Sequence, residues 1–328
     1  MLTDHLFSVF DQRDGSAGLP AAIRSLIEQQ RKSWPLLGRG YEALSSLRLR
    51  EIQVEGYRVF LQFNPARIVS TGANVDEAAI RSRQCFLCVD NLPSEQRGIL
   101  YRDEFLILCN PAPIFFGHCT IAHIEHRPQE LRPSMGLFLE LARDLGPEYT
   151  VFYNGPKCGA SAPDHLHFQA APAGAIPIEH EAIRPDRRQI LSSVGGTTLV
   201  LLQGLGREVV LIEGDDLSMI VELMNNFLES LETLSGRTEE PMVNVIAGFT
   251  DGAWRSIIFP RRKHRPDVFF MEGEGKILVS PAAVDMGGLI VTPLEKDFAR
   301  IGPDLVDAIY HEVSLGRETI VESLRDLL

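Results

Sequence analysis

Residues 165–171, with the sequence HLHFQAA, constrain the fold of this chain more than any other stretch. Polar residues alternate with apolar ones, which is the period of a β-strand whose two faces differ. We therefore expect a strand that turns His165, His167 and Gln169 to one face and the intervening apolar residues to the other. The apolar face would pack on a core, which leaves the polar face for chemistry.

This polar face suits chemistry at phosphorus. A neutral imidazole is a competent nucleophile near neutral pH, because its ordinary pKa is about 6.5. Residues two apart on a strand lie roughly 6.5–7 Å apart along its axis, so His165 and His167 can serve two adjacent sites. Gln169 can donate a hydrogen bond to a phosphate oxygen but cannot protonate a leaving group. Such a site favours trapping a nucleotidyl group for another acceptor over handing it to water.

Several segments offer groups that could hold phosphate oxygens. The small-residue run NGPKCGAS at 154–161 precedes the strand, and glycine lets backbone N–H groups approach an anion closely. The turn-like NPAR at 64–67 and the basic run FPRRKHRP at 259–266 contain arginines, which bind phosphate bidentately. The candidates for substrate binding are Asn64, Arg67, Asn154, Gly159, Ala160, Ser161, Gln169, Arg261 and Lys263.

A CxxC pair suggests a metal site. The segment CFLC places Cys85 and Cys88 at the spacing of a zinc knuckle, in which two thiolates bind one ion from a tight turn. Two further ligands are needed: the candidates are His126 and His165, with His118 and His123 as rivals for the fourth position. A closed site of two cysteines and two histidines would be structural. The alternative is a pair of buried core thiols.

Charge and cysteine content narrow the class of protein. With a formal net charge of −12, we expect no nucleic-acid partner. No apolar run reaches the ~18 residues of a membrane span, and the first residues lack a basic lead, so we expect neither signal peptide nor membrane anchor. The five cysteines, an odd count in a chain of 328 residues, favour reduced thiols and a cytoplasmic location.

The apolar patterns predict an α+β protein in which an antiparallel sheet has flanking helices. A helix is expected around 23–32, and another at 134–146, between the strands expected at 118–124 and 150–154. Residues 1–56 are expected to form an N-terminal helical segment, 57–190 the catalytic half and 191–328 a second half of similar texture. The expected strands are 57–63, 104–109, 118–124, 150–154, 165–171, 198–203, 208–214, 242–249, 254–260, 276–280 and 288–292, with later helices at 217–234, 304–313 and 318–328.

The segment YNGPKCGASAPDHLHFQ, residues 153–169, resembles the active-site segment of the histidine triad superfamily. The branch it resembles is the transferase branch with HxHxQ: galactose-1-phosphate uridylyltransferase, diadenosine tetraphosphate phosphorylase (ATP adenylyltransferase) and the GDP-hexose phosphorylases. HCTIAHIEHRPQEL, residues 118–131, is similar to the strand-plus-histidine segment that precedes it. The resemblance covers residues 58–172 and implies two histidine-triad-like halves, the second degenerate because it lacks HxHxQ.

The resemblance also implies roles for individual residues. His167 corresponds to the nucleophile and Gln169 to the glutamine that contacts the phosphate. The structural zinc ligands of the uridylyltransferases correspond to Cys85, Cys88, His126 and His165. One departure is Asp164, which stands between Pro163 and His165 where the uridylyltransferase pattern has no residue.

The function expected from these features is nucleotidyl transfer through a covalent nucleotidyl-histidine. The donor is a dinucleoside polyphosphate or a nucleotide-sugar, and the acceptor is inorganic phosphate or a sugar phosphate. Asp164 departs from the uridylyltransferase pattern, which favours the phosphorylase side. The alternatives are a hydrolase of the same superfamily and a zinc-stabilised nucleotide-binding module without turnover. A homodimer is compatible with the sequence.

Overall fold

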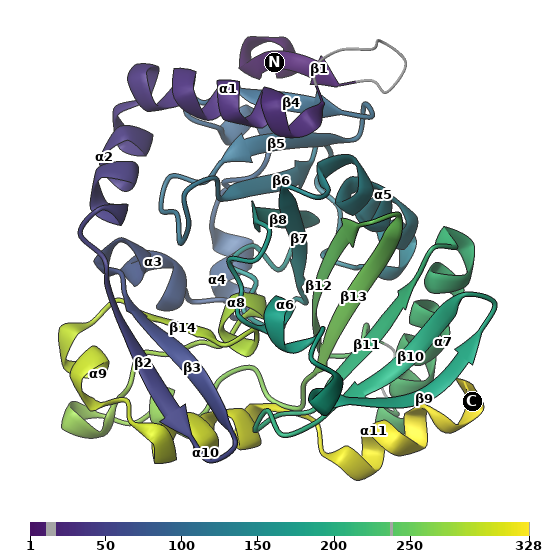
Figure 1. The fold of residues 1–328 in the computed structure, drawn as a ribbon. Helices are drawn as coiled ribbons and strands as arrows, with labels where there is room; N and C mark the ends of the chain where they lie inside the picture. The colour runs from purple at the N-terminus through teal and green to yellow at the C-terminus, as the bar shows by residue number, and fades with distance from the viewer. Residues whose placement is uncertain (11–17, 237–238, 328) are drawn as a thin grey trace.

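A sheet of eleven strands, antiparallel except at one edge, runs through the molecule and carries the HxHxQ strand near its centre (Figure 1). The computed structural model describes residues 1–10, 18–236 and 239–327. Within them the strand order across this sheet is β1-β4-β5-β6-β8-β7-β12-β13-β11-β10-β9. The bounds are β1 Leu6–Phe10, β4 Gly98–Tyr101, β5 Phe105–Cys109, β6 Cys119–His123, β7 Tyr149–Asn154, β8 His167–Pro172, β9 Arg188–Val194, β10 Thr197–Leu202, β11 Val209–Gly214, β12 Val243–Thr250 and β13 Ala253–Pro260.

The order of the strands is the same on both sides of the central β7–β12 pair. From the outside inwards it is β4-β5-β6-β8-β7 on one side and β9-β10-β11-β13-β12 on the other. In each group a helix joins the third strand to the innermost one: α5 (Met135–Leu145) connects β6 to β7, and α7 (Leu217–Ser235) connects β11 to β12. The central strands pair antiparallel, with Asn154 opposite Asn244. Strand β8, which carries the HxHxQ motif, therefore lies next to the central pair of the sheet.

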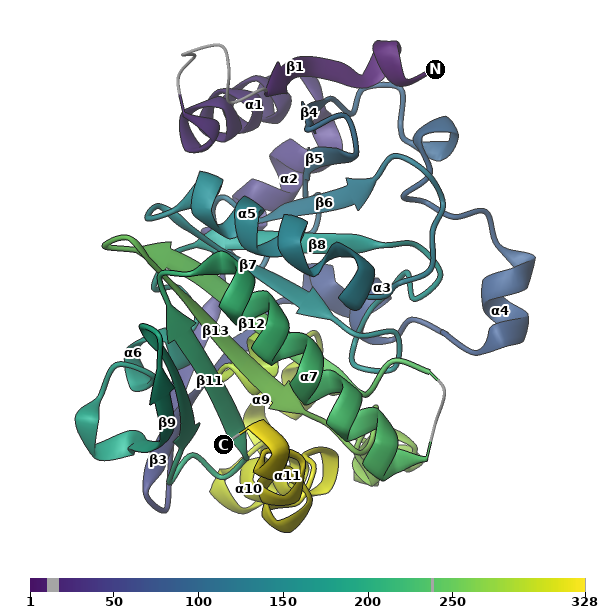
Figure 2. The same ribbon diagram turned by 90° about the vertical axis from the view of Figure 1, so that its right-hand side faces the viewer.

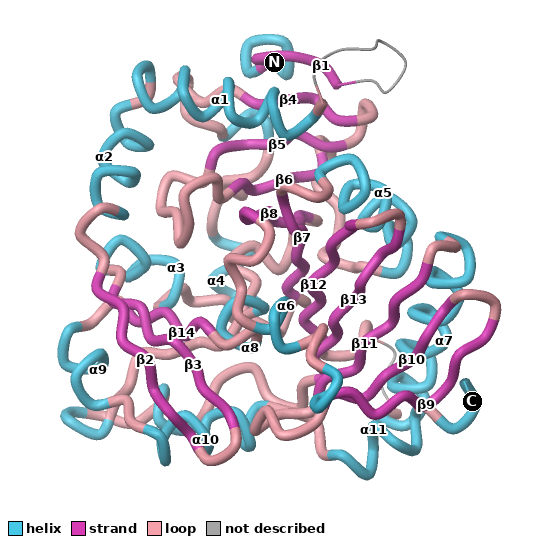
Figure 3. The backbone as a smooth tube through the Cα atoms, in the orientation of Figure 1, coloured by secondary structure: helices cyan, strands magenta, loops and turns pink. Residues whose placement is uncertain are grey.

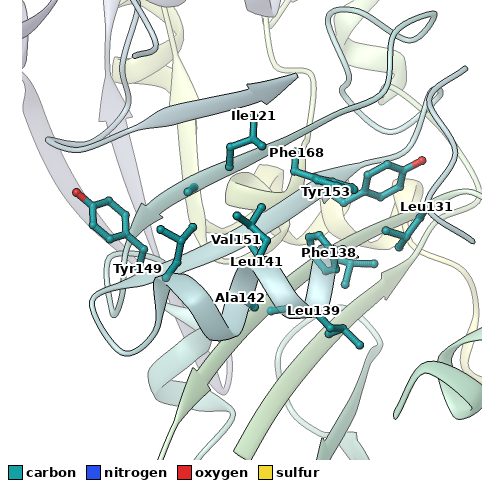
Figure 4. Packing of buried hydrophobic residues seen from close by; sticks show 14 of the residues in the cluster. Ile121, Leu131, Phe138, Leu139, Leu141, Ala142, Tyr149, Val151, Tyr153 and Phe168 are labelled. Carbon is teal, nitrogen blue, oxygen red and sulfur yellow. The ribbon is translucent and has the colours of Figure 1, made fainter. Parts of the chain in front are cut away.

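Three helices cover one face of the large sheet: α5, α7 and α1 (Leu19–Ser33). In Figure 2, α5 and α7 lie in front of the central strands. Helix α5 buries Phe138 and Leu141 against Val151 of β7 and Phe168 of β8, as Figure 4 shows. Each large apolar side chain buried in this way stabilises the fold by about 1.5–3 kcal/mol. The expected apolar face of the HxHxQ strand is thus part of this core.

The opposite face carries a second core under a small sheet of three strands, which lies apart from the large one (Figure 3). Strand β3 (Tyr57–Phe63) pairs antiparallel with β2 (Arg48–Val54) and parallel with β14 (Leu289–Thr292). The small sheet thereby joins segments from both ends of the chain. The remaining helices are α2 Pro35–Leu44, α3 Ile68–Thr71, α4 Glu77–Ser82, α6 Ile178–Glu181, α8 Ala283–Met286, α9 Glu295–Arg300, α10 Pro303–Val313 and α11 Arg317–Ser323.

Most expected elements are present, but the structure corrects three of them. The HxHxQ strand begins at His167, so His165 lies in the preceding turn and not on the strand face. Residues 276–280 form no strand. The last helix ends at Ser323, and a short 3₁₀ turn follows it. Helices α1 and α2 lie in the segment 1–56 that was expected to be helical, but this segment also contains the strands β1 and β2. Strands β4 and β9 and the short helices α3, α4, α6, α8 and α9 had not been expected.

The expected domain boundaries remain predictions. Strand β2 pairs with β3 across the boundary at 56, and β9 spans the boundary at 190. Within the described part of the chain, no helix is both long and apolar enough to cross a membrane.

Candidate functional site

Strand β8 borders a pocket of about 430 Å³. Its walls come from β8, the end of β7 and the loop between them, the segments before β4, the segment from β5 to β6, and the segment from residue 280 to 291 around α8. The lining residues that matter below are Arg67, Arg83, Asn154, Gly159, Ser161, His167, Gln169 and Asp285. The pocket therefore brings together most of the residues that the sequence singled out for catalysis and substrate binding.

His167 is held as a neutral ring with a defined tautomer. Its Nδ1 lies 2.8 Å from the carbonyl oxygen of His165, which can only accept a hydrogen bond, so Nδ1 carries the proton and Nε2 the lone pair. Burial is the main reason that the pKa of His167 falls to about 4. The unprotonated Nε2 is thus the nitrogen left for the pocket.

The backbone of His167 is fixed by Gln129. The amide oxygen of Gln129 accepts a hydrogen bond from the His167 N–H at 2.8 Å. Its amide nitrogen donates to the carbonyl oxygens of His167 at 3.0 Å and of Asn154 at 2.9 Å. One buried side chain therefore ties the start of β8 to the end of β7.

Gln169 is oriented by a second buried side chain, His118. The backbone N–H of Ile114 donates to Nδ1 of His118 at 3.1 Å, so that nitrogen has no proton and Nε2 has one. His118 Nε2 then donates to Oε1 of Gln169 at 2.9 Å. Burial, and next the charge of Arg67, lower the pKa of His118 to about 3, so the ring stays neutral. With its oxygen engaged, Gln169 has its NH₂ group available for the pocket.

Arg67 places a positive charge in the same pocket. Its Nη1 donates to the carbonyl of Ala112 at 2.9 Å, and burial lowers its pKa to about 10, which leaves it charged near pH 7. Asp285 is also buried here, and burial raises its pKa to about 6. Both carboxylate oxygens of Asp285 accept backbone N–H groups, from Val291 at 2.9 Å and Ala282 at 3.0 Å. Arginine in a buried setting is well suited to a phosphate.

The loop before β8 packs against the segment around α8. Gly159 has a φ of +92°, and a Cβ at this position would lie 2.6 Å from the Cβ of Ala282, so only glycine fits. Asn154 Oδ1 accepts hydrogen bonds from the N–H of Ala283 at 2.7 Å and from Asn244 at 2.8 Å. The loop and the second half of the chain thus build the pocket together.

Four of the expected substrate-binding residues do not line this pocket. Asn64 is buried and donates to Gln62 and to the carbonyl of Pro113. Ala160 is buried between Gly159 and Ser161. Arg261 is buried with all five N–H groups bonded to protein oxygens, and Lys263 forms ion pairs with Asp267 and Glu312. The basic run therefore stabilises the fold and does not meet the ligand in this pocket.

The expected metal ligands form a separate cluster beside the pocket. One ligand atom from each of Cys85, Cys88, His126 and His165 lies within 4.8 Å of the others. Nδ1 of His165 is 3.3 Å from Cys85 Sγ, and Nδ1 of His126 is 3.2 Å from Cys88 Sγ.

The protonation of His165 fits a metal ligand. Its Nε2 lies 2.8 Å from the carbonyl oxygen of His123 and must donate, so the lone pair is on Nδ1 and points at the thiols. Two thiols and two such imidazoles can hold a metal ion. The rivals lie elsewhere: His118 contacts Gln169, and His123 Nδ1 contacts the backbone of Glu125.

Three residues of the site were missed as functional candidates. Gln129 carries no motif that marks it, and His118 was considered only as a metal ligand. Arg83, which lines the pocket, lies in a segment of mixed composition. Their roles depend on contacts between residues 38 to 81 positions apart, which single-sequence patterns do not reveal.

The fold of this chain is similar to that of solved structures of yeast Ap4A phosphorylase. Yeast Ap4A phosphorylase Apa2 shares the fold with a TM-score of 0.59 and 16% identity, over 92% of this chain and 95% of that chain. Its complex with AMP has a TM-score of 0.57 at 16% identity and covers 89% of this chain and 96% of that chain. Its complex with Ap4A has a TM-score of 0.54 at 16% identity, and the match covers 89% of this chain and 97% of that chain.

At the level of sequence, the model of the domain of unknown function DUF4922 matches residues 26–172. No curated protein matches the sequence significantly. The similarity to the yeast structures agrees with the expected α+β fold, a large antiparallel sheet with flanking helices.

Proposed function

We propose that this chain is a nucleotidyltransferase of the phosphorylase type that works through a covalent nucleotidyl-histidine on His167. The observation that carries the proposal is the arrangement on β8. A neutral His167, with its lone pair on Nε2, shares one pocket with an oriented Gln169 and the half-buried charge of Arg67. A nucleophile, a hydrogen-bond donor and a cation are the groups that displacement at a phosphate requires.

In the first step, the Nε2 lone pair of His167 attacks the α-phosphorus of a dinucleoside polyphosphate or a nucleotide-sugar. An N–P bond forms, and the bond from that phosphorus to the bridging oxygen breaks, so the leaving phosphate takes the electron pair. The Nδ1 proton stays in its hydrogen bond to the His165 carbonyl. Gln169 and Arg67 would hold the non-bridging oxygens.

In the second step, an oxygen of inorganic phosphate attacks the same phosphorus, and the N–P bond breaks. The electron pair of that bond returns to Nε2, so His167 leaves as a neutral imidazole. The phosphate group that leaves in the first step needs no proton from the protein, which suits a site with glutamine at the third motif position. The shared fold of the yeast enzyme, which was solved with AMP and with Ap4A, makes an adenine dinucleotide the first donor to test. A sugar phosphate as acceptor would make the protein a uridylyltransferase-type enzyme.

We infer that the Cys85–Cys88–His126–His165 cluster binds zinc in a structural role. Thiolate and imidazole are the ligands zinc prefers, and four protein ligands leave no open position for a substrate. The ion would tie the CxxC turn to the residues before β8.

We also infer that the large sheet consists of two histidine-triad-like halves, of which the second is degenerate. The repeated strand order and the matching places of α5 and α7 support this. Strand β13, the counterpart of β8 in that order, contains no histidine. The second half would then serve as a wall of the pocket.

The test is a labelling experiment with Ap4A, a GDP-hexose and a UDP-hexose, each carrying ³²P at the α-phosphorus. We expect one donor to leave acid-labile, base-stable label on the protein, and inorganic phosphate to release it as a nucleoside diphosphate. His167→Ala should carry no label. His180→Ala, an exposed histidine whose Nε2 contacts only the Gly174 carbonyl, should be labelled like the wild type.

The other outcomes are distinct. Label that survives His167→Ala, or no label with any donor, contradicts the covalent mechanism. Steady donor turnover without phosphate or sugar phosphate would indicate a hydrolase. Equal nucleotide binding by wild type and His167→Ala, without label on either, would indicate a binding module.

A further inference from the structure

Asp164, the additional residue in front of the HxHxQ motif, lies between the metal cluster and the pocket. It sits in the turn before β8, and its side chain is 22% exposed. One carboxylate oxygen accepts a hydrogen bond from Nη2 of Arg83 at 3.2 Å. The other lies 3.6 Å from Nε2 of His126. The two contacts point in different directions, one to a metal ligand and one to a residue that lines the pocket.

The contact with His126 has the geometry of a carboxylate that orients a ligand histidine. Nδ1 of His126 faces Cys88 Sγ at 3.2 Å, so a metal bound there leaves the ring proton on Nε2. That nitrogen is the one nearest Asp164. A carboxylate in this position fixes the ring's tautomer and rotation and makes the ligand nitrogen more basic. This support matters here because the His126 side chain is 46% exposed.

The contact with Arg83 connects the same carboxylate to the loop between β7 and β8, which carries Ser161. Nη2 of Arg83 also donates to the carbonyl oxygen of Ser161 at 3.0 Å. The guanidinium lies 5.2 Å from the ring centre of Phe86, which stands between the two cysteines of the CxxC turn. Arg83 thus contacts the turn that carries Cys85, the loop that carries Ser161, and Asp164.

We propose that Asp164 is a positioning residue that sets the orientation of the metal ligand His126 and, through Arg83, holds the Ser161 loop against the metal cluster. The proposal rests on the metal site inferred above but not on nucleotidyl transfer. It assigns a role to the one residue by which this chain departs from the pattern that its active-site segment resembles.

The test measures zinc affinity by competition with a chromophoric chelator, and the visible absorption of the Co²⁺-loaded protein. Asp164→Ala should bind zinc about 10- to 100-fold more weakly than the wild type, the loss typical of removing such a partner. Asp164→Asn should lose less, because its amide oxygen can face the Nε2–H of His126 as the carboxylate oxygen does in the wild type. The Co²⁺ spectrum should change in Asp164→Ala because the imidazole is no longer held.

The matched control is Asp90→Asn. Asp90 is exposed and follows Cys88, and its charge acts on the Cys88 thiol as that of Asp164 does. It has no contact with a ligand histidine in the described structure. We expect its zinc affinity to stay within about twofold of the wild type and its Co²⁺ spectrum to be unchanged. Circular dichroism of the metal-free variants shows whether each is folded.

The proposal is overturned if folded Asp164→Ala binds zinc as tightly as the wild type, or if Asp90→Asn loses as much affinity, since charge alone would then explain the effect. A wild type that binds neither zinc nor Co²⁺ would also overturn it. Failure here leaves the labelling of His167 untouched, so the two hypotheses can be separated.

Discussion

At the scale of the residue, one buried hydrogen bond decides which end of an amide faces the pocket. His118 Nε2 donates to Gln169 Oε1, and the N–H of Ile114 holds His118 in the tautomer that allows it. His118→Asn keeps an acceptor near Nδ1 but cannot reach Gln169. We expect its rate of His167 labelling to fall about 5- to 10-fold, the effect of one lost hydrogen bond of about 1 kcal/mol.

His118→Gln provides the matched variant, because its amide nitrogen lies near the place of Nε2 and can still donate to Gln169. We expect it to label His167 faster than His118→Asn does, although the Ile114 N–H loses its partner and stability falls by about 1–3 kcal/mol. Equal labelling rates in the two variants would show that His118 does not orient the glutamine. Quench-flow labelling and urea unfolding separate the two effects.

At the scale of the element, the loop before β8 depends on a close approach between backbone segments. Gly159→Ala places a Cβ 2.6 Å from that of Ala282 and strains a residue at φ +92°. Strain of this kind costs about 1–3 kcal/mol, and the clash adds to it. We expect AMP binding, measured by calorimetry, to weaken at least about 10-fold because the pocket wall shifts.

A substitution at Gly252 serves as the control, because it would introduce backbone strain without a steric clash. It has a φ of +82° in the β12–β13 turn, and nothing lies within 4 Å of the place of its Cβ. Gly252→Ala should lower stability by a similar strain cost and leave AMP binding unchanged. If both variants bind AMP like the wild type, the contact between Gly159 and Ala282 does not shape the pocket.

The contacts of Glu240 with β7 and with the segment before α5 should make the free energy of unfolding depend on pH. Glu240 lies 2.6 Å from the Tyr153 hydroxyl of β7 and contacts the N–H groups of Leu131 and Arg132 ahead of α5. Burial raises its pKa from 4.5 to about 7, so the folded protein holds a proton that the unfolded chain releases. The contribution of this bound proton to the free energy of unfolding is at its full value below the ordinary pKa of 4.5. It is lost as the pH rises through about 7.

Urea unfolding of the wild type and Glu240→Gln across this range tests the shift. The stability of the wild type relative to Glu240→Gln should fall by up to about 1.4 kcal/mol per pH unit between the two pKa values and then level off. Parallel profiles would mean that Glu240 keeps an ordinary pKa in the folded protein.

The elements also indicate what a single sequence can predict. Strand β3 has the predicted bounds of 57–63, and α7 begins at the predicted Leu217 because Asp216 caps it through the N–H groups of Ser218 and Met219. Residues 276–280 have the apolar pattern of a strand but form none, because pattern alone does not supply a pairing partner. Pairing of β3 with β14, more than 220 residues away, likewise leaves no local signal.

At the scale of the whole molecule, the second half of the chain holds the loop between β7 and β8 in place through a network of buried hydrogen bonds. Asn244 bonds to Asn154 and to the carbonyl of Cys158, and Arg261 Nη1 donates to Asn244 at 2.6 Å. The positive charge of Arg261 led to the prediction that it binds phosphate. The sequence cannot distinguish an exposed arginine from one whose five N–H groups form hydrogen bonds inside the fold. That distinction depends on how the two halves meet.

If the chain binds AMP as proposed, this network should make the affinity for AMP sensitive to a residue outside the pocket. Arg261→Met would leave several buried oxygens without donors, so we expect stability to fall on the order of 3 kcal/mol and AMP affinity to fall with it. Arg262→Met changes the neighbouring arginine, which is exposed and donates only to the carbonyls of His311 and Glu312. It should cost less than about 1 kcal/mol and bind AMP normally. If folded Arg261→Met binds AMP like Arg262→Met, the second half does not hold the loop through Arg261.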